Sequence, residues 1–376
     1  VLVTNRIGEH YAALTGAGPV PIAFPPYQRA HDEDAAWRGS DRRQAAAAWW
    51  KAALTDLPEV TGPVPGRATS GHDFIRETRW LPDDLANLLE VYSETHKLSW
   101  PDVLNALTGA YLARWTGNEA VIGLPFMARI GRKIARLPCM AMNVLPHRIH
   151  PDEGAPLPDW LRDQAALMRE ARKYGLYRSE YLRRDLGLIG GSRRLYGPLV
   201  NVQPFDRPPV FPGLQVGLHI LGAGAVDDLT FTFRGDPQAG LLFEVDANPA
   251  LYTATDIAGH SARLITFLSA ALRAENLAQI PTASPTEIAA TNAVNDTSHP
   301  LTDTTLTALI EAQMVARLEK IALTFDDNHL NFNELDRISA ALAARLQALG
   351  AGPDRLVAVA LERSLHLPIA LLAVLR

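Results

Sequence analysis

The sequence predicts an α/β (α+β) fold, a mixed sheet with flanking helices, followed by the opening of a second α/β domain. Amphipathic segments alternate with short apolar runs over the first 280 residues. At 281–303 the composition changes to Thr, Ser, Pro, Asn and Ala, which is typical of a linker. After it the helix and strand pattern begins again. We therefore expect domains at 1–280 and 304–376, joined by a linker at 281–303.

The helices of the first domain are predicted from their apolar periodicity and from their ends. The first helix closes at Gly16, and the prolines between 19 and 26 favour an extended loop after it. Leu85, Leu89 and Tyr92 share one helical face. Further helices are expected at 41–54, 82–97, 99–117, 156–173, 177–187 and 253–274.

Strands are predicted where short runs are rich in β-branched and aromatic residues. In the first domain these runs lie at 74–82, 119–126, 139–149, 199–205, 214–222, 228–235 and 240–249. In the second domain we expect helices near 306–316, at 333–350 and at the end of the chain, with strands at 321–325 and 356–361.

Composition and charge restrict the class of protein. The chain has 376 residues, a net charge of −5 and 47% hydrophobic residues, so it is globular and carries no sign of a nucleic-acid partner. Its one cysteine, Cys139, excludes an intrachain disulfide, and no apolar run could cross a membrane. We expect a cytoplasmic protein, and we read the chain as a piece of a longer one.

Two stretches place an asparagine in an apolar run ahead of a proline: MNVLP at 142–146 and VNVQP at 200–204. A buried amide is costly unless its donors and its acceptor are satisfied. Asn143 and Asn201 are therefore candidates for a binding site. The alternative is that both amides only tie their strands to neighbouring loops, since most side-chain hydrogen bonds go to backbone or water.

No motif for catalysis or metal binding is found in the sequence. It has no phosphate-binding loop, no H-E-x-x-H and no G-x-S-x-G. His147 and His150 lack the further ligands that a metal ion needs, so no metal site is predicted. The basic cluster that includes Arg132 and Lys133 is either a solvated loop or a docking site for a phosphate or an acidic partner.

Several stretches in one order resemble a known family. They are AFPPYQRAHDEDAAWRGS, GLPFMARIGRKIARLPCMAMNVLPHRI, RSEYLRRDLG, LYGPLVNVQPFD, GAVDDLTFTFRG and FEVDANPALY. Together they resemble the condensation domain of nonribosomal peptide synthetases, especially of the siderophore-assembly type. The stretch from 305 to 364 resembles the start of an amino-acid adenylation domain, with LNFNELDRIS in place of its L-T-Y-x-E-L motif. Leu318 and Glu319 depart from that pattern, which usually has Thr-Pro there.

The resemblance implies a chloramphenicol-acetyltransferase-like fold and amide-bond formation between thioesters. The substrates would arrive on the phosphopantetheine arms of upstream and downstream peptidyl carrier domains of the same synthetase. ATP and Mg²⁺ would serve the full adenylation domain, and the chain itself would bind no cofactor. The family's catalytic H-H-x-x-x-D-G is not in this sequence, which has no adjacent histidines. We expect that motif upstream of Val1, the chain to cover mostly the C-terminal lobe, and the isolated chain to be inactive.

The resemblance also implies roles for individual residues. Asn143 and Asn201 would lie on two walls of the substrate tunnel. Asp227 would orient a substrate amine, or else cap a turn. Arg129 would pair with the aspartate of the catalytic motif, a structural role at the active site. Arg132, Lys133 and Arg178 would dock a carrier domain.

Two other readings remain open from the sequence. One is a stand-alone acyltransferase of the same superfamily that uses coenzyme A, against which the adenylation-like tail argues. The other is a degenerate condensation-like domain that serves only as a docking platform. The activated amino acid, the donor and the final product are not encoded in this stretch.

Overall fold

The computed structural model describes residues 2–69, 73–129, 131–189, 194–204, 209–217, 224, 226–301 and 303–376. The chain divides into two compact units, one up to Asn292 and one from Ala293 onward. Each unit has a hydrophobic core of its own. This division falls inside the stretch in which the sequence places the linker.

A six-stranded mixed sheet forms the centre of the first unit, with the strand order β1-β6-β5-β4-β2-β3. Strand β4 runs parallel to both β2 and β5, and the other pairs are antiparallel. The carboxyl ends of β2, β4 and β5 therefore meet at one edge. The strands are β1 Ile75–Trp80, β2 Ala120–Met127, β3 Met142–Ile149, β4 Leu199–Gln203, β5 Leu229–Asp236 and β6 Gly240–Ala247.

The two faces of this sheet differ in chemistry. Phe231, Phe233 and Phe243 are fully buried on the face that helices cover. On the opposite face Asn201, Thr232 and Glu244 stand in register across β4, β5 and β6. Alternation of side chains along each strand produces this division. The sheet thus carries an apolar face under helices and a polar face away from them.

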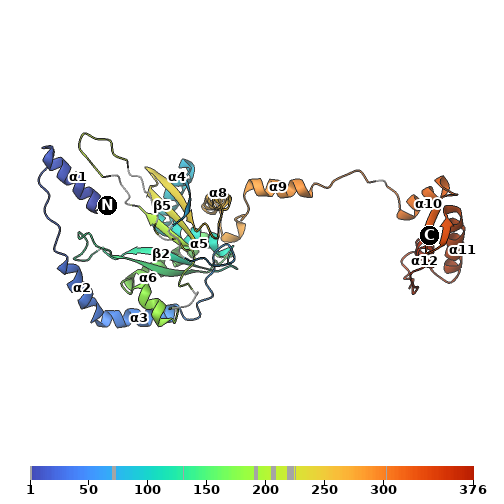
Figure 1. Cartoon of the computed structure of the whole chain (residues 1–376), viewed down its shortest axis with the longest axis horizontal. Coiled ribbons are helices and arrows are strands. Elements are labelled where there is room, and N and C mark those ends of the chain that lie inside the picture. Colours follow the sequence, from blue (N-terminus) through green and yellow to red (C-terminus); the bar gives the residue numbers. More distant parts are fainter. Residues whose placement is uncertain are drawn as a thin grey trace. The chain divides into compact units, whose positions relative to one another are not determined.

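Helices α4 Asp83–His96, α5 Trp100–Ala113, α6 Leu157–Lys173 and α8 Ala254–Ala271 supply the cover, and Figure 1 labels them around the sheet. Helix α5 lies deepest, since twelve of its fourteen residues are buried. A Cβ at Gly109 would lie 2.6 Å from Ile149 and 3.2 Å from Ile122, so only glycine lets α5 approach the sheet this closely.

A smaller core joins α3 Asp41–Ala53 to α7 Ser179–Asp185. Trp50 is buried and its Nε1 donates to the Tyr174 carbonyl at 3.1 Å, while Trp49 stacks on the Tyr174 ring. Both tryptophans are therefore core aromatics. Helix α1 Leu2–Leu14 was predicted, and α2 Gln28–Arg38 was not. The sequence of α2 has no apolar stripe, and none of its residues is fully buried.

Two predictions around the first unit need comment. Residues 214–217 of the expected strand at 214–222 have no strand structure, so that prediction is wrong there, and 218–222 lie outside the described residues. The stretch read as a linker contains the helix α9 Pro285–Asn295. Glu287 in its first turn accepts from Arg263 of α8 at 2.5 Å, which fixes the start of α9 to the first unit.

The second unit is a small helical layer with a hairpin. It comprises α10 Leu306–Ala316, β7 Ile321–Phe325, β8 Asn328–Asn331, α11 Phe332–Ala348 and α12 His366–Leu375. Met314, Leu335 and Leu372 form its core. Asn331 and Glu334 cap α11 reciprocally, and Gly350 with a φ of 95° follows its end, as the sequence predicts.

The predicted strand at 356–361 is wrong, because this segment has no regular secondary structure. A strand needs a partner that completes its backbone hydrogen bonds. Within the described part of the chain the small sheet contains only β7 and β8, which pair with each other. Leu356 is accordingly fully exposed.

Candidate functional site

The candidate site lies at the loop end of the β2–β3 hairpin, where β2 ends at Met127 and β3 begins at Met142. In the loop that connects them, the guanidinium of Arg129 donates to the carbonyls of Leu137, at 2.6 Å, and Cys139. Ile134 and Leu137 of this loop are buried. A guanidinium can hold two carbonyls at once because its donors form a rigid fork. Arg129 therefore sets the shape of the loop.

The next basic residues of the loop differ in environment. Arg132 donates to the Ala128 carbonyl at 2.9 Å and to Glu33 of α2 at 2.8 Å, so it joins the loop to that helix. Lys133 is exposed. Arg178, just before α7, is 54% exposed and lies 3.6 Å from Asp34 of α2. Glu33 and Asp34 were not among the predicted site residues, although they lie in the first stretch that carries the family resemblance.

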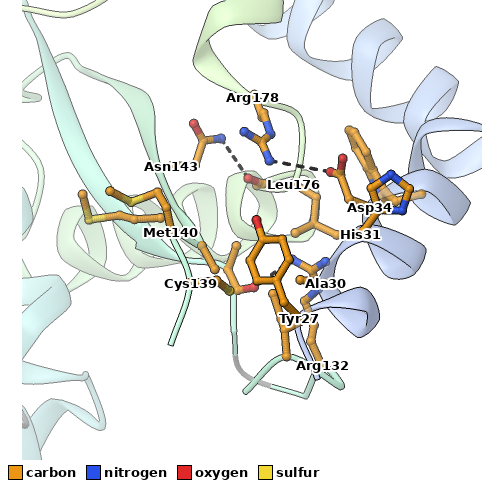
Figure 2. Close-up of a pocket in the computed structure, with 16 residues that line it drawn as sticks. Tyr27, Ala30, His31, Asp34, Arg132, Cys139, Met140, Asn143, Leu176 and Arg178 are labelled. Atoms are coloured by element: carbon orange, nitrogen blue, oxygen red, sulfur yellow. Dashed lines mark hydrogen bonds and ion pairs between the residues drawn. The ribbon is translucent and has the colours of Figure 1, made fainter. Parts of the chain in front are cut away.

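Two cavities border the loop, and both are lined by the residues from Cys139 to Met142. One, of about 180 Å³, lies between α2 and the turn that leads into α7. Figure 2 shows Arg132, Asn143 and Arg178 around it. The other, of about 270 Å³, is lined by Met127, Arg129 and Asn201. The fold thus brings six of the seven predicted site residues to one corner, with Lys133 on the loop between them.

Asn143 is buried, and backbone groups satisfy its amide completely. Nδ2 donates to the carbonyls of Gly175 at 2.9 Å and Tyr177 at 2.8 Å. Oδ1 accepts from the amides of Val144 and Ser179, both at 3.0 Å. Figure 2 shows the amide turned toward the segment that carries Leu176. All four hydrogen-bonding positions of the amide are used, which favours the alternative in which Asn143 ties β3 to the next segment.

Asn201 has a different environment on β4. It is half-buried on the polar face of the sheet, and its side chain has no hydrogen-bond partner among the described residues. It lines the cavity with Arg129, and two positions on, Gln203 accepts from Arg234 at 2.7 Å. The amide of Asn201 is therefore available to a molecule in that cavity.

Asp227 stands apart from this corner. It is exposed and lines neither cavity, and its carbonyl accepts from Arg194 at 2.8 Å. Its neighbour Asp228 is buried and accepts from Tyr252 at 2.6 Å and from Arg194 at 3.1 Å. Burial raises the pKa of the Asp228 carboxyl, which these two donors counteract. These hydrogen bonds of Asp228 fix the backbone next to Asp227.

The described residues contain no group of three or more side chains that could hold a metal ion. His147 lies buried against α6, with Nε2 3.1 Å from Gln164 Oε1. Burial lowers the pKa of His147 to about 4. Among the helices described, none is long and apolar enough to span a bilayer.

Comparison with known proteins places this architecture. The family described as the condensation domain matches residues 1–288, and the family described as AMP-binding enzyme matches residues 310–376. The first condensation domain of the calcium-dependent antibiotic synthetase, with a substrate analogue, is similar with a TM-score of 0.69 at 28% identity, over 75% of this chain and 63% of that one. VibH, a condensation enzyme of a nonribosomal peptide synthetase, gives 0.65 at 28% identity, over 75% and 68%.

Curated relatives agree. A dimodular nonribosomal peptide synthase of Bacillus subtilis (strain 168) is 33% identical over all of this chain and 16% of its own length. Enterobactin synthase component F of Escherichia coli O157:H7 is 29% identical over 99% of this chain and 29% of its own length. The chain thus spans less than a third of the length of either of these two curated relatives.

The fold and the matched regions define the class as the chloramphenicol-acetyltransferase-like condensation fold followed by the start of an AMP-binding domain. The chain belongs to the condensation-domain family of nonribosomal peptide synthetases. The resemblance drawn from the sequence is thereby confirmed for both domains and for the siderophore synthetases among the relatives.

Proposed function

We propose that the protein to which this chain belongs is a peptide synthetase that forms amide bonds between carrier-bound thioesters. The observation that carries the proposal is the order of two domains in one chain, a condensation domain at 1–288 and the start of an AMP-binding enzyme at 310–376. The synthetase from Bacillus subtilis matches this chain across both parts. A stand-alone acyltransferase that uses coenzyme A would have no reason to carry the second part.

The partners in this proposal are carrier domains of the same synthetase, with their phosphopantetheine arms. The exposed Lys133 and the half-exposed Arg178 would meet the phosphate of such an arm or acidic side chains around it. Arg132 supports that surface through Glu33. ATP and Mg²⁺ would be used by the complete adenylation domain. Cytoplasmic location stays a prediction.

In this proposal the residues of this chain position the substrates. The open amide of Asn201, next to Arg129 in the cavity of about 270 Å³, would hydrogen-bond a carbonyl or amine of a substrate. Asp227, held by its backbone through Arg194, would orient the attacking amine. An amine must be deprotonated before it can attack a carbonyl, so a general base is required. The 376 residues contain no His-His pair, and this chain alone is expected to form no amide.

The test uses the full-length synthetase with each carrier domain charged with a thioester. Mass spectrometry of the carrier domains should show the donor group on the acceptor carrier as an amide. A Lys133→Ala, Arg178→Ala double variant should raise the concentration of acceptor carrier needed for half-maximal rate when that carrier is supplied as a separate protein. Charged carriers that never give an amide would refute the proposal and favour a domain that only docks its neighbours.

A further inference from the structure

A third cavity, of about 430 Å³, lies on the helix-covered face of the sheet, between the first turns of α5, the last turns of α6 and the strands β2, β3 and β4. Its size falls within the range of pockets that bind small organic molecules. Most of its wall is apolar, with Leu124, Met168, Val200 and Val202 among the lining residues. None of the predicted site residues lines it.

His147 gives this cavity a hydrogen-bond acceptor. Because the Oε1 atom of Gln164 can only accept, the Nε2 atom of His147 must donate to it, which leaves the lone pair on Nδ1. No hydrogen bond to Nδ1 exists among the described residues. The ring is neutral at pH 7, because burial holds its pKa at about 4. A neutral imidazole in this state accepts a hydrogen bond and carries no charge.

Asn105 of α5 adds a second unsatisfied group to the same wall. It is only 7% exposed, and its Oδ1 has no hydrogen-bond partner. A buried polar atom without a partner is uncommon and calls for an explanation. The charged residue in the lining, Arg172, is already paired with Asp102 at 2.5 Å. The cavity thus offers the Nδ1 acceptor of His147, the amide of Asn105 and an apolar wall, and no free charge.

We propose that this cavity binds a neutral aliphatic molecule that carries a hydrogen-bond donor, either an alcohol or a primary carboxamide. The apolar body would rest on Leu124, Met168 and Val202, and its donor would meet Nδ1 of His147 or, after a small movement of the side chain, the amide of Asn105. Carboxylates are disfavoured because Arg172 is already paired, and ammonium groups because a buried cation would have no counter-charge. The inference does not depend on the proposed function.

The first experiment titrates the 376-residue chain with hexanamide, hexanoate and dipropyl ether and follows protein methyl signals by NMR. Hexanamide should bind saturably. Dipropyl ether, which has no donor, should bind about tenfold more weakly, and hexanoate should not bind measurably. Absence of saturable hexanamide binding would overturn the proposal. So would equal affinity for the amide and the ether.

Two variants locate the site. His147→Leu keeps an apolar wall and removes the acceptor, so hexanamide affinity should fall about tenfold, to that of the ether, while ether affinity changes little. Val200→Phe, at a residue that lines this cavity and not the one beside Arg129, fills the apolar end and should abolish binding of both probes. Should either variant fail to fold, the other still decides. Unchanged hexanamide binding in a folded variant of either kind would contradict the assignment.

Discussion

The two asparagines of the stretches MNVLP and VNVQP, Asn143 and Asn201, differ in their hydrogen bonding in the folded chain. Asn143 on β3 points to the helix-covered side of the sheet. All hydrogen-bonding positions of its amide are occupied by backbone groups, three of them between Gly175 and Ser179. Asn201 on β4 lies on the polar face, where a cavity reaches it and no described residue pairs with it. The same local sequence thus serves to fix a loop in one strand and to leave a group open in the next.

The difference follows from strand register. Asn143 stands opposite Phe126, whose ring packs in the core with α3 and α7, whereas Asn201 stands opposite Thr232 on the other face. Side chains alternate between the two faces of a sheet. A shift of one residue along the strand therefore moves an asparagine from the helix-covered face to the face that borders a cavity. Both stretches form strands, and the register of each strand decides whether its asparagine binds the backbone or is open to a ligand.

The largest effect is expected from Asn143→Ala. The substitution leaves two carbonyls and the Ser179 amide without their partner, which should lower the free energy of unfolding by about 3 kcal/mol. All seven tryptophans lie at or before Trp160, so their fluorescence in urea reports on the first unit alone. Asn201→Ala is the matched control. An equal loss of unfolding free energy in both variants would contradict the claim that only Asn143 stabilises the fold.

Acid should reveal the other buried polar group of β3. The pKa of His147 is lowered to about 4, below its ordinary 6.5, so the unfolded chain binds more protons between those pH values. The free energy of unfolding should therefore fall as the pH falls through this window, by up to about 1.4 kcal/mol per pH unit from this residue. His260, whose pKa is also lowered to about 4, adds a similar dependence.

The variant His147→Leu should remove its share of that slope and leave the share of His260. Urea midpoints measured between pH 7 and 4.5 check this. Asn201→Ala should leave the slope unchanged. A wild-type slope in His147→Leu would show that the ring is not buried in its neutral form.

Arg129→Ala should cost about 2 kcal/mol, because the carbonyls of Leu137 and Cys139 lose a charged donor. Arg129→Lys should recover little of it, since an ammonium cannot span both carbonyls as the guanidinium does. Arg136→Ala, at an exposed arginine in the same loop, is the control and should stay within about 0.5 kcal/mol of the wild type. A similar loss in both alanine variants would mean that Arg129 does not organise the loop.

The smallest effect is expected where α2 meets the loop. The ion pair of Glu33 and Arg132 is about one-fifth exposed on each side, and Glu33→Gln should cost about 0.5 kcal/mol at low salt. In 1 M NaCl the difference from the wild type should shrink, because salt screens partly exposed charges. A loss of unfolding free energy that does not depend on salt would indicate that Glu33 stabilises this contact by packing and not by its charge.

Much of the fold could be predicted because its helices and strands carry strong periodic patterns, as in α4 and β5. Helix α2 was not predicted because it buries no apolar stripe. The segment at 356–361 was predicted as a strand from its apolar and β-branched residues, but no described strand pairs with it. For the site, the family resemblance selected seven residues, and six of them, all but Asp227, lie at one corner. It could not separate Asn143 from Asn201, because their difference lies in the backbone partners supplied by residues 175–179.

The most direct test of this contrast is the single-turnover rate of amide formation by the full-length synthetase carrying Asn201→Ala. We predict a rate about tenfold below that of the wild type, with the urea midpoint of the first unit unchanged, since the amide of Asn201 is left for a substrate group. A wild-type rate at wild-type stability would contradict the account and leave Asn201 without a role in the site.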